Sequence, residues 1–361
     1  MSLMKAAVIS GESDPLSVIA EIPIPKINDD EILIKAKAFA INPTDWKHID
    51  YKIGQKGDIL GSDVSGIVEQ VGSNIKNFKK GDFVSSFICG NVSKTNGAFA
   101  EYVAASPNAT IKYNHLTNDS KESKSGPINT FDGAASVTLG LVTVGITYSY
   151  YFDLGKNKKD GDFILIWGGS TATGILAIQL AKLIYNLKII TTASPKNHEF
   201  LKNLGADYTF DYNDPEVVNK IRETSQNKLH FAFDTIAQQD TFQKVYDSTS
   251  TTTGDIHIDS LLLLDDKSIK LDSSRNNSNI HWGKTLAYLA IDKFKIMGDK
   301  IERPGDLLDY YLPWWNDVLP KYLKDLKHGN LKILKNGLGS VDEGLKLSKK
   351  GVSNEKIVFS I

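Results

Sequence analysis

The sequence predicts an α/β protein that combines a β-rich unit with a unit built on a parallel sheet. Two observations support this fold class. The first 110 residues contain short apolar runs separated by glycines, whereas from residue 163 onward apolar strands alternate with amphipathic helices. Strand–helix alternation at this spacing is typical of βαβ units and a parallel sheet. The 361 residues are enough for two domains, at roughly 100–200 residues per domain.

The N-terminal part of the chain reads as strands. A short apolar run covers Lys5–Ile9, and Glu31–Ile41 alternates loosely between apolar and polar residues. Glycines recur from Gly61 to Gly97. Short strands with such turn signals predict a barrel or a sandwich-like unit. Residues 115–130 (HLTNDSKESKSGPINT) are polar and rich in lysine and serine, which predicts a linker or surface loop.

The middle of the chain alternates between strands and helices. Apolar residues at helical spacing after the FILIW run predict a helix, and Ser-Pro and Asp-Pro pairs are typical helix openings. The predicted order is strand Phe163–Trp167, helix Thr171–Leu187, strand Lys188–Thr192, a helix from Ser194-Pro195 to Gly205, strand Tyr208–Phe210, a helix opened by Asp214-Pro215, and strand Leu229–Asp234.

Four further elements are expected outside this series. Asp255–Leu264 is predicted to be a strand, Leu307–His328 a helix, and the tail Glu355–Ile361 a final strand. Gly133–Phe152 runs 20 residues without a charge, about the length needed to cross a bilayer. Its eight hydroxyl side chains and three glycines make it only moderately apolar, so a buried helix is expected instead.

Composition excludes several function classes. The 42 basic and 43 acidic residues give a net charge of −1, which argues against a protein whose main task is to bind nucleic acid or an anionic membrane. Cys89 is the single cysteine, so neither a disulfide framework within the chain nor a cysteine-rich zinc site can form. We expect a cytoplasmic protein that acts on a small molecule, and a homodimer is compatible with the sequence.

The strongest chemical signal is WGGSTATG, residues 167–174. Gly169 and Gly174 occupy the first and third positions of a G-x-G-x-x-G dinucleotide fingerprint, and Thr171 stands at the second. The Thr171 side chain must therefore point away or donate to a phosphate oxygen. With Ser170 and Thr173, this loop is predicted to bind the pyrophosphate at the helix N-terminus. The alternative is an ordinary glycine-rich turn.

The end of the second strand of this series predicts which dinucleotide binds. NAD-binding units place an acidic residue there for the ribose 2′-OH, but the sequence reads Thr192-Ala193-Ser194-Pro195-Lys196-Asn197. The missing carboxylate, together with Ser194, Lys196 and Asn197, favours NADP by charge complementarity. The alternative is that Ser194 only caps a helix and Lys196 is solvated.

No metal site is predicted. A catalytic zinc needs three protein ligands from Cys, His, Asp or Glu. Cys89 is isolated, and the seven histidines are scattered without an H-x-x-x-H pair.

The motifs resemble the zinc-free branch of the medium-chain dehydrogenase/reductases, in particular quinone-oxidoreductase-like proteins and fungal trans-acting enoyl reductases. The similar segments include INPTDWK (41–47), LGSDVSGIVEQVG (60–72), NGAFAEYV (96–103) and GGSTATG. In zinc-containing relatives a cysteine stands near Asn42, and a G-H-E near Gly61-Ser62-Asp63. The resemblance implies a GroES-like β-barrel catalytic domain, residues 1–130 and 296–361, with a Rossmann doubly wound domain, residues 131–295, inserted between its two parts.

The resemblance also implies an activity. It predicts NADPH-dependent hydride transfer to the β-carbon of an α,β-unsaturated carbonyl, or to a quinone. Lys47 and Thr143 match residues near the substrate, and Tyr212 matches a tyrosine at the adenine end. The alternatives are an aldehyde or ketone reductase on the same scaffold and a non-catalytic NADPH-binding sensor.

Overall fold

The computed structural model describes residues 2–118, 123–291, 294–296 and 299–361, without the side chains of residues 294–296, 299 and 300. The chain divides into two compact units. The first unit contains residues 1–142, 288–303 and 327–361, and the second contains residues 143–287 and 304–326. The first unit thus extends beyond the expected boundary at residue 130. Residues 304–326 belong to the second unit and not to the first, because their helices pack on its buried aromatic residues.

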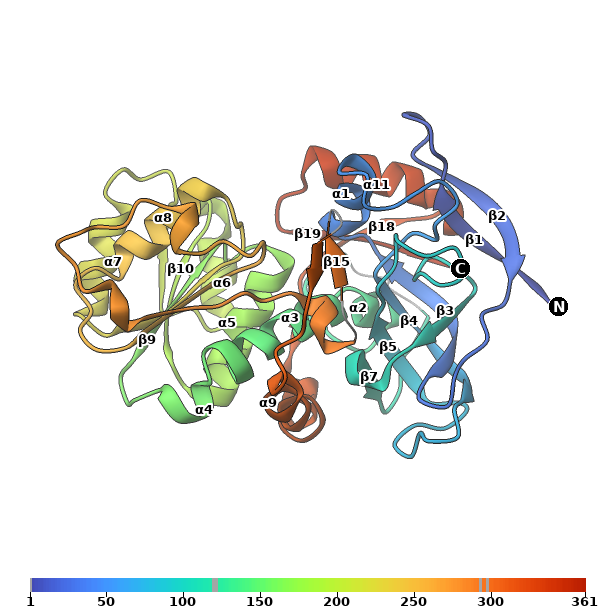
Figure 1. The fold of residues 1–361 in the computed structure, drawn as a ribbon, viewed down its shortest axis with the longest axis horizontal. Helices are drawn as coiled ribbons and strands as arrows, with labels where there is room; N and C mark the ends of the chain where they lie inside the picture. Colours follow the sequence, from blue (N-terminus) through green and yellow to red (C-terminus); the bar gives the residue numbers. More distant parts are fainter. Residues whose placement is uncertain (1, 119–122, 292–293, 297–298) are drawn as a thin grey trace. The chain divides into compact units, whose positions relative to one another are not determined.

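The first unit is built on a seven-stranded sheet of order β18-β19-β3-β4-β5-β7, with β6 paired to β3 (Figure 1). All its pairings are antiparallel except β18–β19. Its strands are β1 (Leu3–Ile9), β2 (Ser17–Pro23), β3 (Ile32–Ala40), β4 (Asp63–Val71), β5 (Phe83–Phe87), β6 (Tyr102–Ala105), β7 (Thr110–Tyr113), β8 (Gly126–Pro127), β15 (Phe294–Ile296), β16 (Asp299–Ile301), β17 (Lys327–His328), β18 (Asn330–Leu334) and β19 (Glu355–Ser360); its helices are α1 (Pro43–Asp50), α2 (Phe131–Ala135) and α11 (Val341–Lys350).

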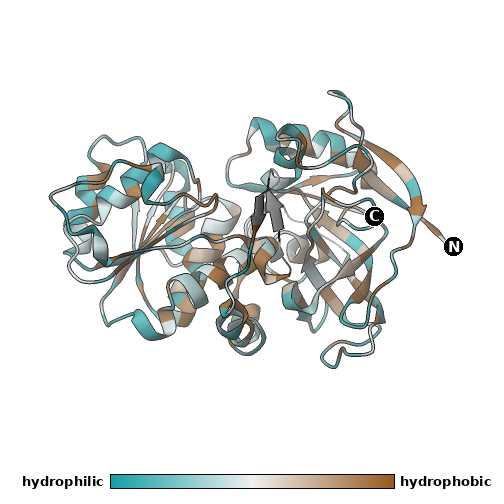
Figure 2. Cartoon of the chain, in the orientation of Figure 1, coloured by the Kyte–Doolittle hydropathy of each residue, from teal (hydrophilic) through white to brown (hydrophobic). Residues whose placement is uncertain are grey.

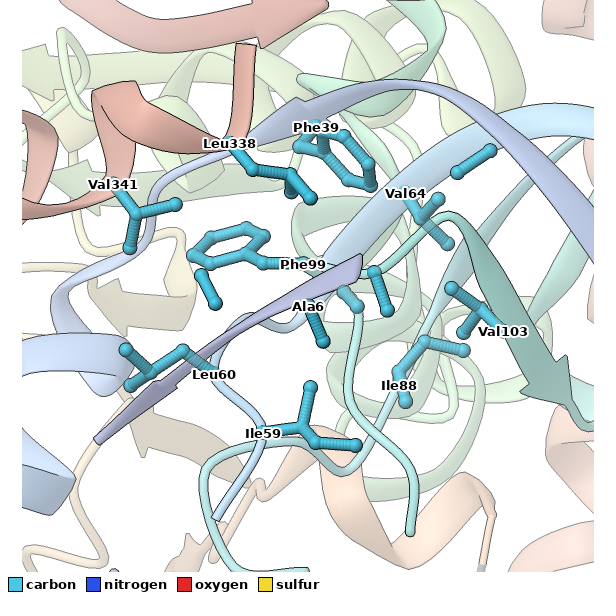
Figure 3. Close-up of a cluster of buried hydrophobic side chains, with 14 of the residues drawn as sticks. Ala6, Phe39, Ile59, Leu60, Val64, Ile88, Phe99, Val103, Leu338 and Val341 are labelled. Atoms are coloured by element: carbon cyan, nitrogen blue, oxygen red, sulfur yellow. The ribbon is translucent and has the colours of Figure 1, made fainter. Parts of the chain in front are cut away.

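The core of the first unit joins the two ends of the chain. Phe39 and Phe99 pack with Leu338 and Val341 around the inner face of the sheet (Figure 3). Leu338 and Val341 come from the C-terminal segment, so the first unit is complete only when this segment has returned to it. Within the polar segment 115–130, residues 126–127 pair with β17, whereas residues 119–122 lie outside the described residues.

The second unit contains the predicted parallel sheet. Its six strands have the order β11-β10-β9-β12-β13-β14, which is the 3-2-1-4-5-6 order of doubly wound dinucleotide-binding folds. The strands are β9 (Phe163–Trp167), β10 (Lys188–Thr192), β11 (Tyr208–Phe210), β12 (Leu229–Asp234), β13 (Ile256–Ser260) and β14 (Ile280–Trp282); the helices are α4 (Leu154–Asn157), α5 (Ala172–Tyr185), α6 (His198–Asn203), α7 (Val217–Ser225), α8 (Gln239–Ser248), α9 (Leu307–Pro313) and α10 (Leu319–Tyr322).

The burial of these elements follows their composition. Every residue of β9 is buried, as expected for a central strand that is covered on both faces. In Figure 2 brown residues lie along the strands of this sheet among paler ones, while teal residues are frequent on its helices. The predicted strands and helices of this region are therefore confirmed, with ends that differ by a few residues.

Two expected elements are interrupted. The helix predicted over 307–328 is divided into α9, a π-helical turn (Trp314–Val318), α10 and a short 3₁₀ turn, and it ends before β17. Pro313 and Pro320 explain the breaks because proline has no N–H to donate within a helix. The strand predicted over 255–264 stops at Ser260, and Leu263 adopts a positive φ of 60°.

The long apolar stretch is an internal helix. Phe131–Tyr151 is long and apolar enough to cross a membrane, but 94% of its most apolar window is buried inside the protein. It comprises α2, α3 (Thr138–Ile146) and a π-helical turn (Thr147–Tyr151), and α3 continues from the first unit into the second.

The start of α5 yields a first prediction. A Cβ on Gly174 would lie 2.4 Å from the carbonyl oxygen of Gly168. Gly174→Ala should therefore lower the stability of the second unit by about 1–3 kcal/mol, as overpacking does, and lower the Tm measured by circular dichroism. Gly155→Ala is the matched control, because a Cβ there meets nothing within 4 Å; its Tm should stay unchanged or rise. An unchanged Tm for Gly174→Ala would contradict this account.

Candidate functional site

The glycine-rich loop of the second unit connects β9 to α5. A Cβ on Gly169 would lie 2.0 Å from the Thr191 hydroxyl oxygen, so no larger residue fits there without rearrangement. The N–H groups of Gly168 and Gly169 donate to the hydroxyl and the carbonyl of Thr192, at 3.1 and 2.9 Å. The loop is thus fixed against β10, and its shape meets the two packing requirements of a dinucleotide-binding turn: a tight bend and close contact between helix and strand.

Thr171 is half-buried, and its side chain is turned toward α5 and Thr235. Its hydroxyl oxygen accepts the N–H of Gly174 at 2.9 Å and lies 2.9 Å from the hydroxyl of Thr235. Thr171 is therefore the N-cap of α5. The first-turn N–H groups of Ala172 and Thr173 have no partner within the helix, as in any helix. Together with the helix dipole, they form the part of this loop suited to an anion.

A turn after β12 supports this loop, and sequence reasoning missed it. Thr235 donates its hydroxyl to the carbonyls of Trp167 and Gly168, at 2.8 and 2.9 Å. Asp234 holds the turn by accepting the N–H groups of Ile236 and Ala237 at 3.0 Å each. Only a polar pair at the end of a parallel strand, Asp234-Thr235, hinted at this role in the sequence.

The predicted adenosine-end residues are partly brought together. The hydroxyls of Ser194, after β10, and Tyr212, after β11, lie 3.2 Å apart. Tyr212 is 41% exposed, and Lys196 is exposed on the 3₁₀ turn Pro195–Asn197. Asn197 is buried and ends that turn. Two hydroxyls therefore lie together beyond the end of β10, and the exposed Lys196 follows in the next turn. Ser170 is half-buried and Thr173 is buried at the start of α5.

In the first unit, helix α1 begins in a buried hydrogen-bond network. The carboxylate of Asp45 accepts the N–H of Asn42 at 2.7 Å, the hydroxyl of Ser62 at 2.8 Å and the amide of Asn91 at 3.0 Å. Burial is the main influence on Asp45 and raises its pKa to about 6. The network fixes α1 against the segment that precedes β4.

A buried cation lies beside this network. Lys356 of β19 hydrogen-bonds the Asn42 side chain and lies 3.7 Å from Asp63, whose other partners are the Asn42 amide and the Leu139 N–H, both at 2.8 Å. Asn42 and Asp63 stand near the positions where zinc-containing relatives carry a cysteine and a G-H-E motif. Here the Asn42 amide donates to Asp63, and the Lys356 ammonium lies beside both side chains. In the part of the chain that the structure describes, no group of three His, Cys, Asp or Glu residues could hold a metal ion.

Lys47 lies on α1 and is half-buried, with its Nζ 5.7 Å from the ring centroid of Trp46. Burial lowers the pKa of the Lys47 ammonium, which makes it a better proton donor. Thr143 lies on α3 in the second unit, where it is buried and its carbonyl accepts the Thr147 hydroxyl at 3.1 Å. The two predicted catalytic residues therefore belong to different units.

The first unit also carries polar residues that the sequence did not single out. The hydroxyls of Thr44, on α1, and Tyr288 lie 2.5 Å apart, and the Thr44 hydroxyl lies 3.2 Å from His48 Nε2. Because Tyr288 is 244 residues from Thr44, no local sequence signal could have shown this pairing.

Comparison with known proteins gives the family. Residues 28–115 match the alcohol dehydrogenase GroES-like domain, and residues 172–280 match the zinc-binding dehydrogenase domain. YNL134C, an uncharacterized protein of Saccharomyces cerevisiae, is 35% identical over 98% of this chain and 97% of its own length. Trans-enoyl reductase TOXD of Cochliobolus carbonum is 37% identical over 79% of this chain and 90% of its own.

Solved structures share the fold. The quinone oxidoreductase of Coxiella burnetii superimposes with a TM-score of 0.67 at 22% identity, covering 100% of both chains. Mycobacterial Rv1454c in complex with NADPH gives a TM-score of 0.67 at 18% identity, covering 99% of this chain and 100% of its own.

The chain belongs to the medium-chain dehydrogenase/reductases, in the branch that contains quinone-oxidoreductase-like proteins and fungal trans-enoyl reductases. It is an oxidoreductase with a GroES-like unit and a Rossmann unit that serves a nicotinamide cofactor. The fold class and the family predicted from the sequence are thereby confirmed.

The turn that supports the loop predicts a pH effect on stability. Burial raises the pKa of Asp234 to about 6, so the folded protein retains this proton at a higher pH than the unfolded chain does. Stability from this residue should therefore fall as the pH rises from about 4 to about 6. In Asp234→Asn this loss of stability should be smaller. The difference in unfolding free energy between variant and parent should therefore be more favourable to the variant at pH 7 than at pH 4, by of order 1–3 kcal/mol.

Urea unfolding at both pH values measures this difference. The amide suits the site because its oxygen can accept the same N–H groups and its NH₂ can donate to Thr241, which now donates to Asp234 at 2.7 Å. Equal pH dependence in parent and variant would show that Asp234 does not titrate in this range.

Proposed function

We propose that this protein is an NADPH-dependent, zinc-independent reductase that transfers hydride to the β-carbon of an α,β-unsaturated carbonyl compound or to a quinone. The observation that carries the cofactor proposal is the pair of hydroxyls of Ser194 and Tyr212, 3.2 Å apart, with the exposed Lys196 in the turn after β10 and no carboxylate in that turn. The acceptor class is supported by relatives that are named trans-enoyl reductases, 31–39% identical to this chain, and by the fold shared with quinone oxidoreductases.

The preference for NADPH is argued from charge. A carboxylate at the end of β10 would repel a ribose 2′-phosphate, whereas an ammonium and hydroxyls can bind it. The two carboxylates that follow β11 are engaged locally: Asp211 accepts the N–H of Asn213 at 2.9 Å, and Asp214 pairs with Lys220. The charge of Asp214 is thus partly neutralised by Lys220, and the Asp211 carboxylate is directed into its own turn.

The residues of this chain can support the reduction without a metal. The bound nicotinamide supplies the hydride. Addition of hydride to an enone produces an enolate, so a donor must stabilise the negative oxygen and a proton must reach the α-carbon. The Lys47 ammonium, with its pKa lowered by burial, suits the second task. Thr143 is proposed to position the substrate.

The cofactor proposal predicts at least a tenfold tighter Kd for NADPH than for NADH, equivalent to about 1.4 kcal/mol. Lys196→Ala should reduce this preference by weakening NADPH binding alone. Fluorescence titration with both cofactors measures it. Lys202→Ala, another exposed lysine of the same region, is the control and should keep the parental preference. Equal affinities in the parent, or an unaltered preference in Lys196→Ala, would exclude this phosphate site.

The catalytic proposal predicts that Lys47→Ala lowers kcat by on the order of 10²–10³ while the NADPH Kd stays nearly unchanged. Thr143→Val should cost less, because a hydroxyl carries no charge and water can replace it. Steady-state reduction of an enone by NADPH measures both effects. Lys56→Ala, an exposed lysine of the same unit, should match the parent. A Lys47→Ala enzyme as fast as the parent would remove Lys47 from the site.

The metal proposal predicts no stoichiometric zinc in the purified protein and full activity in the presence of a chelator. Elemental analysis together with an assay in EDTA tests both statements. About one zinc per chain with loss of activity on chelation would overturn the proposal.

One panel of acceptors separates the proposed activity from its alternatives. NADPH oxidation with enones, enoyl thioesters or quinones supports the proposal. Oxidation with aldehydes or ketones alone would favour a carbonyl reductase, and tight NADPH binding without turnover would favour a sensor.

A further inference from the structure

A buried carboxylate lies at the carboxyl end of the parallel sheet. Asp259, near the end of β13, is fully buried. Its Oδ1 accepts the N–H groups of Ser260 and Thr285, at 2.8 and 3.2 Å, and its Oδ2 accepts the Thr285 hydroxyl at 2.5 Å. In doubly wound folds this edge of the sheet is the ligand-binding edge. One side chain thus ties the end of β13 there to the segment that follows β14.

A glycine leaves the space for this carboxylate. A Cβ on Gly283 would lie 2.3 Å from Asp259 Cγ and 2.5 Å from its Oδ1, so a larger residue at this position would displace the carboxylate. The Gly283 N–H donates to the carbonyl of Ile258 at 2.7 Å, which fixes the close approach. The Asp259 carboxylate is therefore packed directly against the backbone of the segment after β14.

A series of hydrogen bonds leads from this carboxylate to Thr143. The hydroxyls of Thr285 and Thr147 lie 3.0 Å apart, and the Thr147 hydroxyl donates to the carbonyl of Thr143 at 3.1 Å. Thr147 is 0% exposed and Thr285 is 1% exposed, so both hydroxyls are shielded from bulk water. The four residues of this series all belong to the second unit.

The direction of donation in this series follows from the charge of Asp259. Burial raises the pKa of Asp259 to about 6, although its hydrogen bonds favour the ionised form, so above pH 7 the carboxylate predominates. A carboxylate only accepts, and Thr285 therefore donates its one hydroxyl proton to Asp259. The contact between the two hydroxyls must then be donated by Thr147, whose proton is shared between Thr285 and the Thr143 carbonyl.

Thr147 is also the residue at which α3 changes into a π-helical turn, which ends at Tyr151. The other end of this turn is bound to the sheet as well. The Tyr151 carbonyl accepts from His257 Nδ1 at 3.2 Å, and the Tyr151 hydroxyl donates to the carbonyl of Lys284 at 3.0 Å. Single π-helical turns within helices are frequent at functional sites. Here the turn is held at both ends, and Thr143 lies one helical turn before it.

We propose that Asp259 and Thr285 are positioning residues that act through Thr147 to hold Thr143 where it orients the substrate. This inference rests on the proposed function and adds two positioning residues to it. Such a side chain must be held closely, because misplacement by about 1 Å can lower a rate by about 10²-fold. Without the Thr285 hydroxyl, Thr147 loses one of its two acceptors, and the link between α3 and Asp259 is broken.

Thr285→Val tests the proposal, because it replaces the hydroxyl with a methyl group. We expect kcat for an enone to fall by roughly 10-fold, less than the cost of a full ångström of misplacement, with the NADPH Kd unchanged. Thr285→Ser keeps the hydroxyl and should restore most of the rate. Thr249→Val is the matched control: Thr249 is also fully buried in the second unit, and its hydroxyl also donates to a carbonyl, that of Tyr246 at 2.8 Å. A Thr285→Val enzyme as fast as Thr249→Val, or equal rates for Thr285→Val and Thr285→Ser, would overturn the proposal.

Variants of Thr147 and Thr143 test the route of this effect. Thr147→Val breaks the series while Thr285 still donates to Asp259, and it should lower kcat by a similar factor. In a Thr143→Val background, Thr285→Val should add little further loss, because residues that act through one another are not additive. Full additivity, or a parental rate for Thr143→Val, would show that the series does not act through Thr143.

A structural measurement separates failure of this inference from failure of the proposed function. Hydrogen exchange followed by mass spectrometry reports on the backbone N–H groups of residues 143–152 whether or not the enzyme turns over. Exchange there should be faster in Thr285→Val and Thr147→Val than in the parent and Thr249→Val, because local opening becomes easier. Unchanged exchange, or faster exchange with an unchanged kcat, would overturn the positioning role. Absence of enone and quinone reduction by the parent would instead refute the proposed function.

Discussion

The first unit depends on one buried cation, the ammonium of Lys356. It lies between Asn42, at the start of α1, and Asp63, at the start of β4, and it comes from the last strand, β19. Asp63 also accepts the N–H of Leu139 at 2.8 Å, so the same ion pair reaches the beginning of α3. A buried charge without its partner costs roughly 3–5 kcal/mol. The direction of α1, and with it the placement of Thr44, Lys47 and His48, is therefore tied to the last strand of the sheet.

In the second unit, hydroxyl groups fix the glycine-rich loop in place. Thr171, Thr192 and Thr235 all bond to the backbone of the glycine-rich loop or to its helix. These side chains hold the turn in shape, so the N–H groups at the start of α5 are directed by the protein before any ligand arrives. The loop thus keeps the tight bend of a dinucleotide-binding turn although threonine, and not glycine, stands at the second fingerprint position.

The sequence was informative where structure is set by neighbouring residues. The periodicity of β9 and α5 and the glycines at 169 and 174 were sufficient to predict the parallel sheet and its loop, because each depends on local backbone and packing preferences. The pairing of Thr44 with Tyr288, and of Asn42 with Lys356, could not be predicted, because these partners meet only through the fold. Pro313 and Pro320 indicate breaks in the helix over residues 307–328, but the apolar pattern around them favours one continuous helix. Thr143 and Lys47 came from family resemblance, and nothing in local periodicity distinguishes them from other buried threonines or surface lysines.

The topology of the first sheet has a consequence for biosynthesis. β19 lies between β18 and β3, and Phe359 packs on Phe39 and Phe99 with ring centroids 5.0 and 5.2 Å apart. While the chain emerges from the ribosome, the second unit has all of its segments once residue 326 is made, but the first must wait for residues 355–360. The segments of the second unit are therefore complete before those of the first, which is the reverse of the N-terminal-first order usual for domains during translation. Until residues 355–360 are made, Phe39 and Phe99 lack their packing partner Phe359.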